Sequence, residues 1–444
     1  METNGKVIVF GAGYVGLATA AVAACGAWEV VVVDSNAERI RAHQQDIDAG
    51  RDPLGEPGMA HALRRVALVV PAGHPQARPS SVLAEDEIRG CVVVCAVGTP
   101  YNPATGTTSA EAVCAVARQA AAGRAGVFVL RSTVSPAVLP AVRQALTLAE
   151  GGSVPLVVVP EFLREGHAVT DSVYPPRLVI GADAGEARTW ALGVLPGLLS
   201  AVPTTRSVMI PEEASLVKLA TNTALSLRVW LADSIAAVCE ETPMASAGRV
   251  LQAVYLDERL GTPGRPGLGA AGPCLPKDTA AFGATVDSAG VTEAIRRAHE
   301  AVPLRIAARI ERALECIGGG DLITVYGVGF KPDSADWRGS PVIPLIRALL
   351  KRGRRIEVHD PRASASDLDA MRAALRDLPG VELQAQMTPC PAALVLLAIP
   401  KHTLPPLARP PLVVCDPYQL TSYLDWPSSV YLGGGLGRHG DAPS

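Results

Sequence analysis

The sequence predicts an α/β protein with two Rossmann-like, doubly wound domains joined by a central all-helical domain that contains one long helix. Three observations predict this arrangement. Short β-branched runs alternate with Ala-rich stretches over the first third of the chain, and a long middle segment lacks both Gly and Pro. The alternation returns after residues 318–320, so we place the three domains at residues 1–205, 206–316 and 317–444.

Six apolar runs predict the strands of the first domain. They lie at residues 7–10, 30–33, 67–70, 92–95, 127–130 and 156–159. A strand that is apolar on both faces is typical of a parallel sheet covered by helices on either side. The first domain is therefore expected to be doubly wound.

The middle and the end of the chain follow the same reasoning. Residues 212–242 contain neither Gly nor Pro and lie between Pro211 and Pro243, which predicts one helix of about eight turns. A Gly/Pro-rich stretch at 261–276 follows, and 294–316 is expected to be helical apart from Pro303. Strands at 322–326, 356–359 and 393–399, with a helix at 342–351, predict the second α/β domain.

Composition excludes several classes of protein. In a chain of 444 residues, the 40 Lys and Arg nearly balance the 43 Asp and Glu, which argues against nucleic-acid or membrane-surface binding. The nine Cys form no CxxC pair, so we expect neither a disulfide framework nor a metal site. The N-terminus lacks the pattern of a signal peptide, and no apolar run is long enough to span a membrane. We expect a cytoplasmic protein with small-molecule or protein partners.

A glycine-rich turn after the first strand predicts a dinucleotide site. It comprises Gly11, Ala12, Gly13, Tyr14, Val15 and Gly16, and it opens an Ala-rich segment. Asp34 ends the second strand, where a carboxylate accepts from a ribose 2′-hydroxyl and repels a 2′-phosphate. The pattern favours NAD, although Arg39 leaves room for NADP. The alternative is a glycine-rich turn with an unrelated surface aspartate.

Two further loops follow the fourth and fifth strands and carry Thr99 and Thr133. Open α/β sheets bind ligands at the carboxyl ends of their strands. The alternative for either hydroxyl is to cap a helix, which is the common role of Thr in such turns.

Cys274 is the candidate nucleophile. It lies in a glycine-rich loop with Lys277 and Asp278 beside it, and a neighbouring cation favours the reactive thiolate. The remaining cysteines that we considered are expected to be small core residues: Cys25, Cys91, Cys95 and Cys239.

Other polar residues are candidates for the same chemistry. Lys218 and Asn222 are four positions apart on the long helix, so they share one face and can donate to a developing oxyanion. A solvated Lys with a nearby Asn is, however, commonplace. Glu161 follows the sixth strand and is either a general base or a first-turn helix acid.

Together these motifs resemble the UDP-glucose 6-dehydrogenase family, within the UDP-glucose/GDP-mannose dehydrogenase superfamily. The resemblance runs in order to about Pro361. Its motifs are GAGYVG at Gly11, GRDPLGEPG at Gly50, AVGTP at Ala96, RSTV at Arg131, PEFLREG at Pro160, Lys218 with Asn222, DERLG at Asp257, CLPKD at Cys274, GFKP at Gly329 and RGSP at Arg338.

This resemblance implies an NAD-dependent, four-electron oxidation of a sugar C6 alcohol to a carboxylate. Cys274 would carry a thiohemiacetal and then a thioester, Lys218 and Asn222 would steady oxygen charge, and Asp278 or Glu161 would activate water near Thr133. Beyond the glycine-rich turn, Asp34 and Arg39, it implies these cofactor contacts: Thr99, Thr133, Glu165, Lys277 and Arg338. The implied substrate contacts are Phe162, Leu163, Arg164, Glu165, Lys218, Asn222, Arg259, Gly272 and Lys331.

The resemblance also implies a homodimer around the long helix, with Arg259 reaching across it, and Lys331 on the substrate diphosphate. A helix of that length with apolar residues on several faces needs partners beyond one small domain. UDP-glucose, oxidised to UDP-glucuronate, is the favoured substrate.

The sequence departs from the family pattern at several positions. Ala270 and Ala271 stand where an aromatic residue and a glycine are usual, and the other departures are Thr262, Pro263, Pro176 and Gly339. The open alternatives are another nucleotide sugar, such as GDP-mannose or a UDP-N-acetylhexosamine, a nucleoside-linked alcohol, or a non-catalytic binding subunit.

Overall fold

The computed structural model divides the chain into two compact units. The first comprises Met1–Thr221 with Ala284–Asp287, and the second comprises Asn222–Gly283 with Ser288–Ser444. The structure describes residues 5–26, 28–71, 82–83, 85–102, 107–200, 205–242, 245–285, 289–318, 320–331, 336–361, 372, 380–383, 393–396, 411–418 and 429–432. The boundaries 1–205, 206–316 and 317–444 remain predictions.

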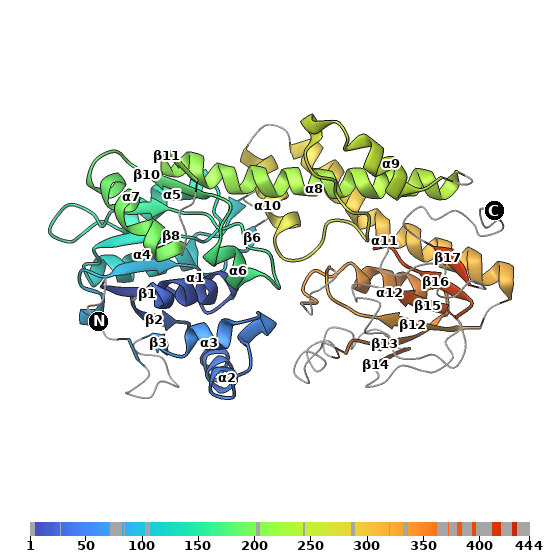
Figure 1. Ribbon diagram of the computed structural model, residues 1–444, viewed down its shortest axis with the longest axis horizontal. Coiled ribbons are helices and arrows are strands. Elements are labelled where there is room, and N and C mark those ends of the chain that lie inside the picture. The colour runs from blue at the N-terminus through green and yellow to red at the C-terminus, as the bar shows by residue number, and fades with distance from the viewer. Residues whose placement is uncertain are drawn as a thin grey trace. The chain divides into compact units, whose positions relative to one another are not determined.

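The first unit is built on a nine-stranded sheet of order β11-β10-β9-β8-β5-β1-β2-β3-β4 (Figure 1). All six predicted strands are present, and every neighbouring pair is parallel except β9 with β10. The strands are β1 (Lys6–Phe10), β2 (Glu29–Val33), β3 (Ala67–Pro71), β4 (Val82–Leu83), β5 (Val92–Cys95), β8 (Val127–Leu130), β9 (Leu156–Val158), β10 (Leu178–Ala182) and β11 (Arg206–Met209). The strand order reverses between β1 and β5, where open α/β sheets bind ligands.

Helices cover both faces of this sheet. Val7 and Val9 of β1 face one buried core, and Ile8 and Phe10 face the other, which explains the continuous apolar runs. The first core includes α1 (Tyr14–Cys25), α2 (Ala37–Asp48), α3 (Met59–Leu63), α6 (Ala168–Val173) and α7 (Glu186–Leu199); the second includes α4 (Glu111–Ala122) and α5 (Leu139–Ala145). The predicted doubly wound fold is confirmed. A short hairpin pairs β6 (Tyr101–Asn102) with β7 (Thr107–Thr108).

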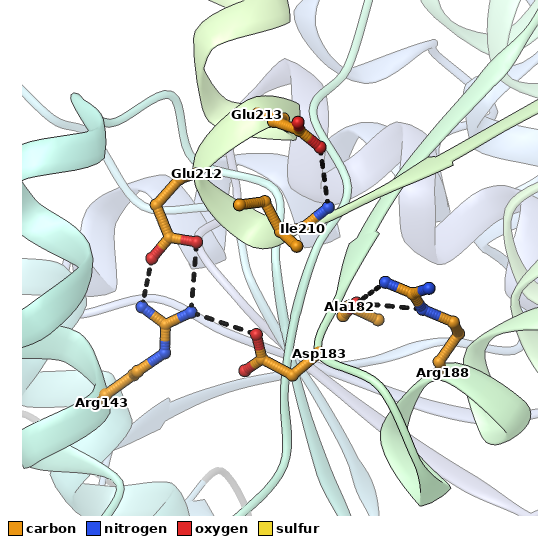
Figure 2. Close-up of polar contacts among 7 residues, drawn as sticks. All are labelled: Arg143, Ala182, Asp183, Arg188, Ile210, Glu212 and Glu213. Atoms are coloured by element: carbon orange, nitrogen blue, oxygen red, sulfur yellow. Dashed lines mark hydrogen bonds and ion pairs between the residues drawn. The ribbon is translucent and has the colours of Figure 1, made fainter.

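The predicted long helix is α8 (Pro211–Glu241), and Figure 2 shows how it begins. Pro211 takes the first helical position, where its missing N–H costs nothing. The Ile210 amide donates to the Glu213 carboxylate at 3.1 Å, which is half of a capping box. The Arg143 guanidinium of α5 pairs with Glu212 and, at 3.5 Å, with Asp183. These contacts attach the start of α8 to the first unit.

The helices of the second unit correct one expectation. The second unit contains α9 (Ala247–Val254), α11 (Ala289–Ile317) and all but the last two residues of α10 (Leu275–Thr285). Pro303 lies inside α11 instead of interrupting it. Val302 and Ile306, on either side of Pro303, are buried in one core, so tertiary packing offsets the backbone hydrogen bond that proline removes.

The second sheet has six strands, all parallel, in the order β14-β13-β12-β15-β16-β17. The strands are β12 (Leu322–Tyr326), β13 (Arg355–His359), β14 (Val381–Leu383), β15 (Ala393–Leu396), β16 (Val413–Cys415) and β17 (Val430–Leu432), with helix α12 (Val342–Leu350). The predicted second α/β domain is confirmed; residues 397–399 of its predicted third strand lie outside the described residues. Among the described helices, none has the length and apolar character that crossing a bilayer requires.

Candidate functional site

The glycine-rich turn joins β1 to α1, and two of its glycines are required by the backbone. A Cβ on Gly11, whose φ is +106°, would lie 2.4 Å from the Ala96 carbonyl oxygen, and one on Gly16 would lie 1.8 Å from the Gly11 oxygen. A Cβ on Gly13 would meet no atom within 4 Å. The turn is therefore tightly packed on the protein side and open at Gly13, beside the N-terminus of α1. This shape fits the approach of a pyrophosphate.

Asp34 lies at the end of β2 and bonds to the same turn. Its Oδ2 accepts from the Ala12 amide at 2.8 Å, and its Oδ1 accepts from the Asn36 amide at 2.8 Å. Arg39 pairs with this carboxylate at 3.1 Å. A buried carboxylate beside the turn fits recognition of a ribose hydroxyl.

His43 is a residue at this turn that the sequence reasoning missed. Its Nε2 lies 3.0 Å from the Ala12 carbonyl oxygen, so this nitrogen carries the proton and donates it. Burial lowers the pKa of His43, which keeps the ring neutral. The only available signal was its position between buried Ile40 and Ile47 on one face of α2.

The loops after β5 and β8 are tied to each other. The Thr99 hydroxyl donates to the Thr133 carbonyl at 2.6 Å, and Ser132 Oγ donates to the Val97 carbonyl at 2.8 Å. Thr99 therefore crosslinks two loops at the reversal of strand order, and the helix-capping alternative does not describe its bond.

Glu161 and Lys218 form a buried ion pair. Lys218 Nζ lies 3.0 Å from Glu161 Oε1, and the Leu163 amide donates to Glu161 Oε2 at 2.7 Å. Burial acts to raise the pKa of Glu161, but Lys218, the Leu163 amide and Arg131 outweigh it and lower this pKa. Glu161 is therefore ionised at neutral pH.

Aromatic and cationic groups surround this pair. The Phe162 ring centroid lies 5.5 Å from Lys218 Nζ and 4.5 Å from Arg177 Cζ, distances typical of cation–π contacts. Arg131 is buried, and burial lowers its pKa to about 10 despite the neighbouring Glu161. Arg164, by contrast, is exposed and pairs with Asp171 at 2.7 Å. Glu165 is half-buried.

Cys274 lies directly before the first residue of α10 and is exposed. Asp278, one turn later, is buried and accepts from Asn222 Nδ2 at 2.5 Å and from Lys277 Nζ at 2.6 Å. A helix N-terminus favours an anion such as a thiolate. The fold thus brings Asn222 to Lys277 and Asp278, which follow the thiol by three and four residues.

The other cysteines follow the expectation with one exception. Cys91, Cys95 and Cys239 are buried, and burial raises the pKa of Cys95 to about 12. Cys25 is exposed, contrary to the prediction, because it ends α1 beyond the packed part of the helix. Among the described residues, no group of three or more His, Cys, Asp or Glu is placed to hold a metal ion.

Gly272 and Lys331 both lie at Phe330. Gly272 has φ +81°, and a Cβ there would lie 2.5 Å from Phe330 Cδ2, so no larger residue fits. Lys331 Nζ lies 5.7 Å from the same ring. Arg259 and Arg338 are exposed and pair with Asp257 and Asp336 at 2.9 Å each; their assigned roles stay predictions.

Comparison with known proteins identifies the chain. It matches three domains in series: the NAD binding domain of the UDP-glucose/GDP-mannose dehydrogenase family at residues 5–192, the central domain at 212–302 and the UDP binding domain at 324–399. The UDP-glucose 6-dehydrogenase of Rhizobium meliloti is 31% identical over 369 residues, or 80% of this chain and 81% of that protein. The chain belongs to the UDP-glucose/GDP-mannose dehydrogenase family.

Two further comparisons agree with this family. The UDP-glucose 6-dehydrogenase TuaD of Bacillus subtilis is also 31% identical, over 81% of this chain and 76% of that protein. A solved UDP-glucose dehydrogenase from Pyrobaculum islandicum superposes with a TM-score of 0.76 at 30% identity, covering 97% of this chain and 98% of that one. This family member is therefore an NAD-dependent oxidoreductase with a nucleotide-sugar substrate.

The family assignment places the candidate residues in its three domains. The glycine-rich turn and Asp34 fall in the NAD binding domain, Lys218 and Cys274 in the central domain, and Lys331 in the UDP binding domain. NAD is the cofactor of the family, and the open space at Gly13 beside Asp34 fits its pyrophosphate and adenosine ribose.

Replacing Asp34 by Asn tests this placement. Asn retains an acceptor for the Ala12 or Asn36 amide but loses the charge, so we expect the KM for NAD to rise about 10-fold, as for loss of a charged hydrogen bond. The preference for NAD over NADP should fall with it. Steady-state kinetics with both cofactors measures the two effects. If the ratio of kcat/KM for NAD to kcat/KM for NADP is unchanged in Asp34→Asn, Asp34 does not face the ribose.

Proposed function

We propose that this protein is a UDP-glucose 6-dehydrogenase that produces UDP-glucuronate and reduces two NAD per sugar, with Cys274 as the nucleophile. The observation that carries the proposal is the exposed thiol at the start of α10, beside the Asn222–Asp278–Lys277 cluster. The names of the Rhizobium meliloti and Bacillus subtilis relatives support the choice of sugar.

The proposed reaction joins two oxidations. Bound NAD would supply the hydride acceptor for both. The C6 alcohol first loses a proton and a hydride and becomes an aldehyde. The Cys274 thiolate adds to the aldehyde carbon, and the aldehyde oxygen takes up a proton, which gives a thiohemiacetal. Loss of the second hydride and of the hydroxyl proton leaves a thioester. Water then breaks the carbon–sulfur bond, which releases the carboxylate and restores the thiolate.

The remaining residues have assigned roles in this proposal. Lys218 and Asn222 stabilise the oxygen that carries negative charge in each step. Glu161 or Asp278 takes the proton of the attacking water, which Thr133 binds. In support of these roles, Lys218 and Asn222 are buried, and each already bonds to a carboxylate. Lys331 is assigned to the diphosphate, and its position in the region that matches the UDP binding domain supports this.

A panel of nucleotide sugars tests the proposal. We expect two NADH per UDP-glucose, with UDP-glucuronate as the product, and little turnover of GDP-mannose, UDP-GlcNAc or UDP-ManNAc. NADH absorbance and chromatography of the product measure both. Turnover of a different sugar would favour the second candidate, a relative with changed specificity, which Ala270 and Ala271 motivate. NAD binding without turnover of any sugar would indicate a non-catalytic subunit.

We also propose that the enzyme is a cytoplasmic homodimer formed around α8. Leu225, Leu227, Trp230 and Val238 of this helix are partly or largely exposed, as an interface helix requires. The eight cysteines that the structure describes form no disulfide bond, which fits a reducing compartment. Sedimentation velocity measures the assembly state, and a monomer at micromolar concentration would contradict the dimer.

A further inference from the structure

The backbone of the loop that leads to Cys274 is anchored at several points within the second unit. We call residues 266–274 the nucleophile loop. The Gly267 amide donates to Asp233 Oδ1 of α8 at 2.6 Å, and the Ala270 amide donates to His299 Nδ1 of α11 at 3.0 Å. The Gly272 amide donates to the Gly339 carbonyl at 3.1 Å. No sequence motif identified either Asp233 or His299.

The contacts of His299 define its tautomer. A backbone amide can only donate, so Nδ1 is an acceptor and the proton of the neutral ring lies on Nε2. Nε2 then donates to Ser226 Oγ, 3.1 Å away on α8. The ring is 7% exposed, and burial lowers the pKa of His299. Both ring nitrogens are therefore satisfied, with opposite roles.

At Gly269 and Ala270 the nucleophile loop packs against α11. A Cβ on neighbouring Gly269, whose φ is +94°, would lie 2.8 Å from the His299 carbonyl oxygen. The loop backbone thus lies directly against α11, and the side chain of His299 holds the next amide. Between this bond and the Gly272 bond, only Ala271 intervenes.

We infer that His299 is a positioning residue whose Nδ1 fixes the Ala270 amide and so fixes the course of the nucleophile loop to Cys274. This inference rests on the proposed role of Cys274. A buried acceptor on α11 pre-organises the loop through the Ala270 amide, and small misplacements of a nucleophile are costly to catalysis.

Two substitutions separate positioning from mere packing. The Oδ1 atom of Asn occupies the place of His Nδ1, so His299→Asn keeps an acceptor for Ala270 and gives up the bond to Ser226. The terminal amide of Gln occupies the place of Nε2, so His299→Gln keeps the bond to Ser226 and gives up the acceptor. Gln fills more of the space of the ring than Asn does. If His299 acts only by packing, His299→Gln should therefore be closer to wild type than His299→Asn. If His299 positions the loop, His299→Asn should be the closer of the two.

Hydrogen–deuterium exchange of the purified full-length chain tests the inference without any substrate. We expect exchange in the peptide spanning 266–274 to be about 10-fold faster in His299→Gln and His299→Ala, because the Ala270 amide loses its partner. His299→Asn should stay close to wild type. Ser226→Ala is the matched control, since it removes the other partner of the ring and leaves the Ala270 bond.

Kinetics provides the second readout. We expect kcat of His299→Gln to fall about 10–100-fold, with the KM for NAD unchanged and with His299→Asn restoring most of the rate. Faster exchange or lower kcat in His299→Asn than in His299→Gln would overturn the inference. If the wild type oxidises no sugar, the proposed function fails, but the order of exchange rates still decides the role of His299. If His299→Gln does not fold, the comparison of His299→Ala with His299→Asn decides the role of His299.

Discussion

Cys274→Ala is expected to lower the rate of uronate formation by at least about 1,000-fold, because no other group is assigned to hold the aldehyde as a thiohemiacetal. The oxidation then stops before the second hydride transfer, so NADH per sugar should not exceed one. Chromatography of the product together with NADH absorbance measures both quantities in one reaction.

The chain offers a matched control for this experiment. Cys316 is also an exposed thiol and lies near the end of α11, outside the nucleophile loop. Cys316→Ala should therefore keep the wild-type rate, which separates loss of the nucleophile from a general effect of removing a thiol. Wild-type uronate formation by Cys274→Ala would place the nucleophile elsewhere and reject the proposed chemistry.

Lys218→Met should have the second large effect, on stability and activity together. It leaves the buried Glu161 carboxylate without its ion-pair partner, which costs about 3–5 kcal/mol in the free energy of unfolding. Loss of the cation proposed to stabilise the oxyanion should lower kcat/KM about 100–1,000-fold. Urea unfolding and steady-state kinetics measure the two effects separately.

The pH dependence of stability follows from the pKa of Glu161. In the wild type this pKa is lowered below 4.5, so the ionised carboxylate stabilises the fold above that pH, and the contribution is lost as pH falls through the folded-state pKa. Removing Lys218 takes away effects that lower this pKa while burial, the largest effect and one that raises it, stays, so the pKa of Glu161 moves upward in the variant. The stability difference between wild type and Lys218→Met should then be widest near neutral pH and narrow as pH falls toward 4.5.

The double variant Lys218→Met/Glu161→Gln completes the design. Removing the carboxylate charge as well should recover much of the lost stability, because no unpaired charge remains buried. Activity should stay low, since the cation is still missing. A double variant no more stable than Lys218→Met would show that the ion pair is not the source of the destabilisation.

Much of the architecture was already determined by the sequence. Strands with apolar residues on both faces can only be satisfied by two covered faces, and Val7 and Ile8 do face opposite cores. Gly11 and Gly16 were recognisable from their spacing in the glycine-rich turn. The structure shows why glycine is required at both positions, since backbone atoms leave no room for a Cβ. The extent of α8 followed from the absence of Gly and Pro between two prolines.

The polar partnerships were decided by the tertiary structure alone. The sequence placed Lys218 and Asn222 on one face of the long helix and proposed Glu161 and Asp278 separately, but only the fold pairs Glu161 with Lys218 and Asn222 with Asp278. Asn222 and Asp278 are 56 positions apart, and no periodicity encodes such a contact.

Tertiary structure also decides that α11 continues through Pro303 and that His299 accepts a hydrogen bond from the Ala270 amide. Local sequence patterns reflect the backbone preferences of residues that are neighbours along the chain. The cost of a proline in a helix, or the partner of a lone buried histidine, depends instead on which distant groups the packed core brings against it. Local sequence patterns therefore predict the two sheets, the long helix and the cofactor turn, whereas the contacts that hold the residues around the proposed nucleophile depend on how distant segments pack.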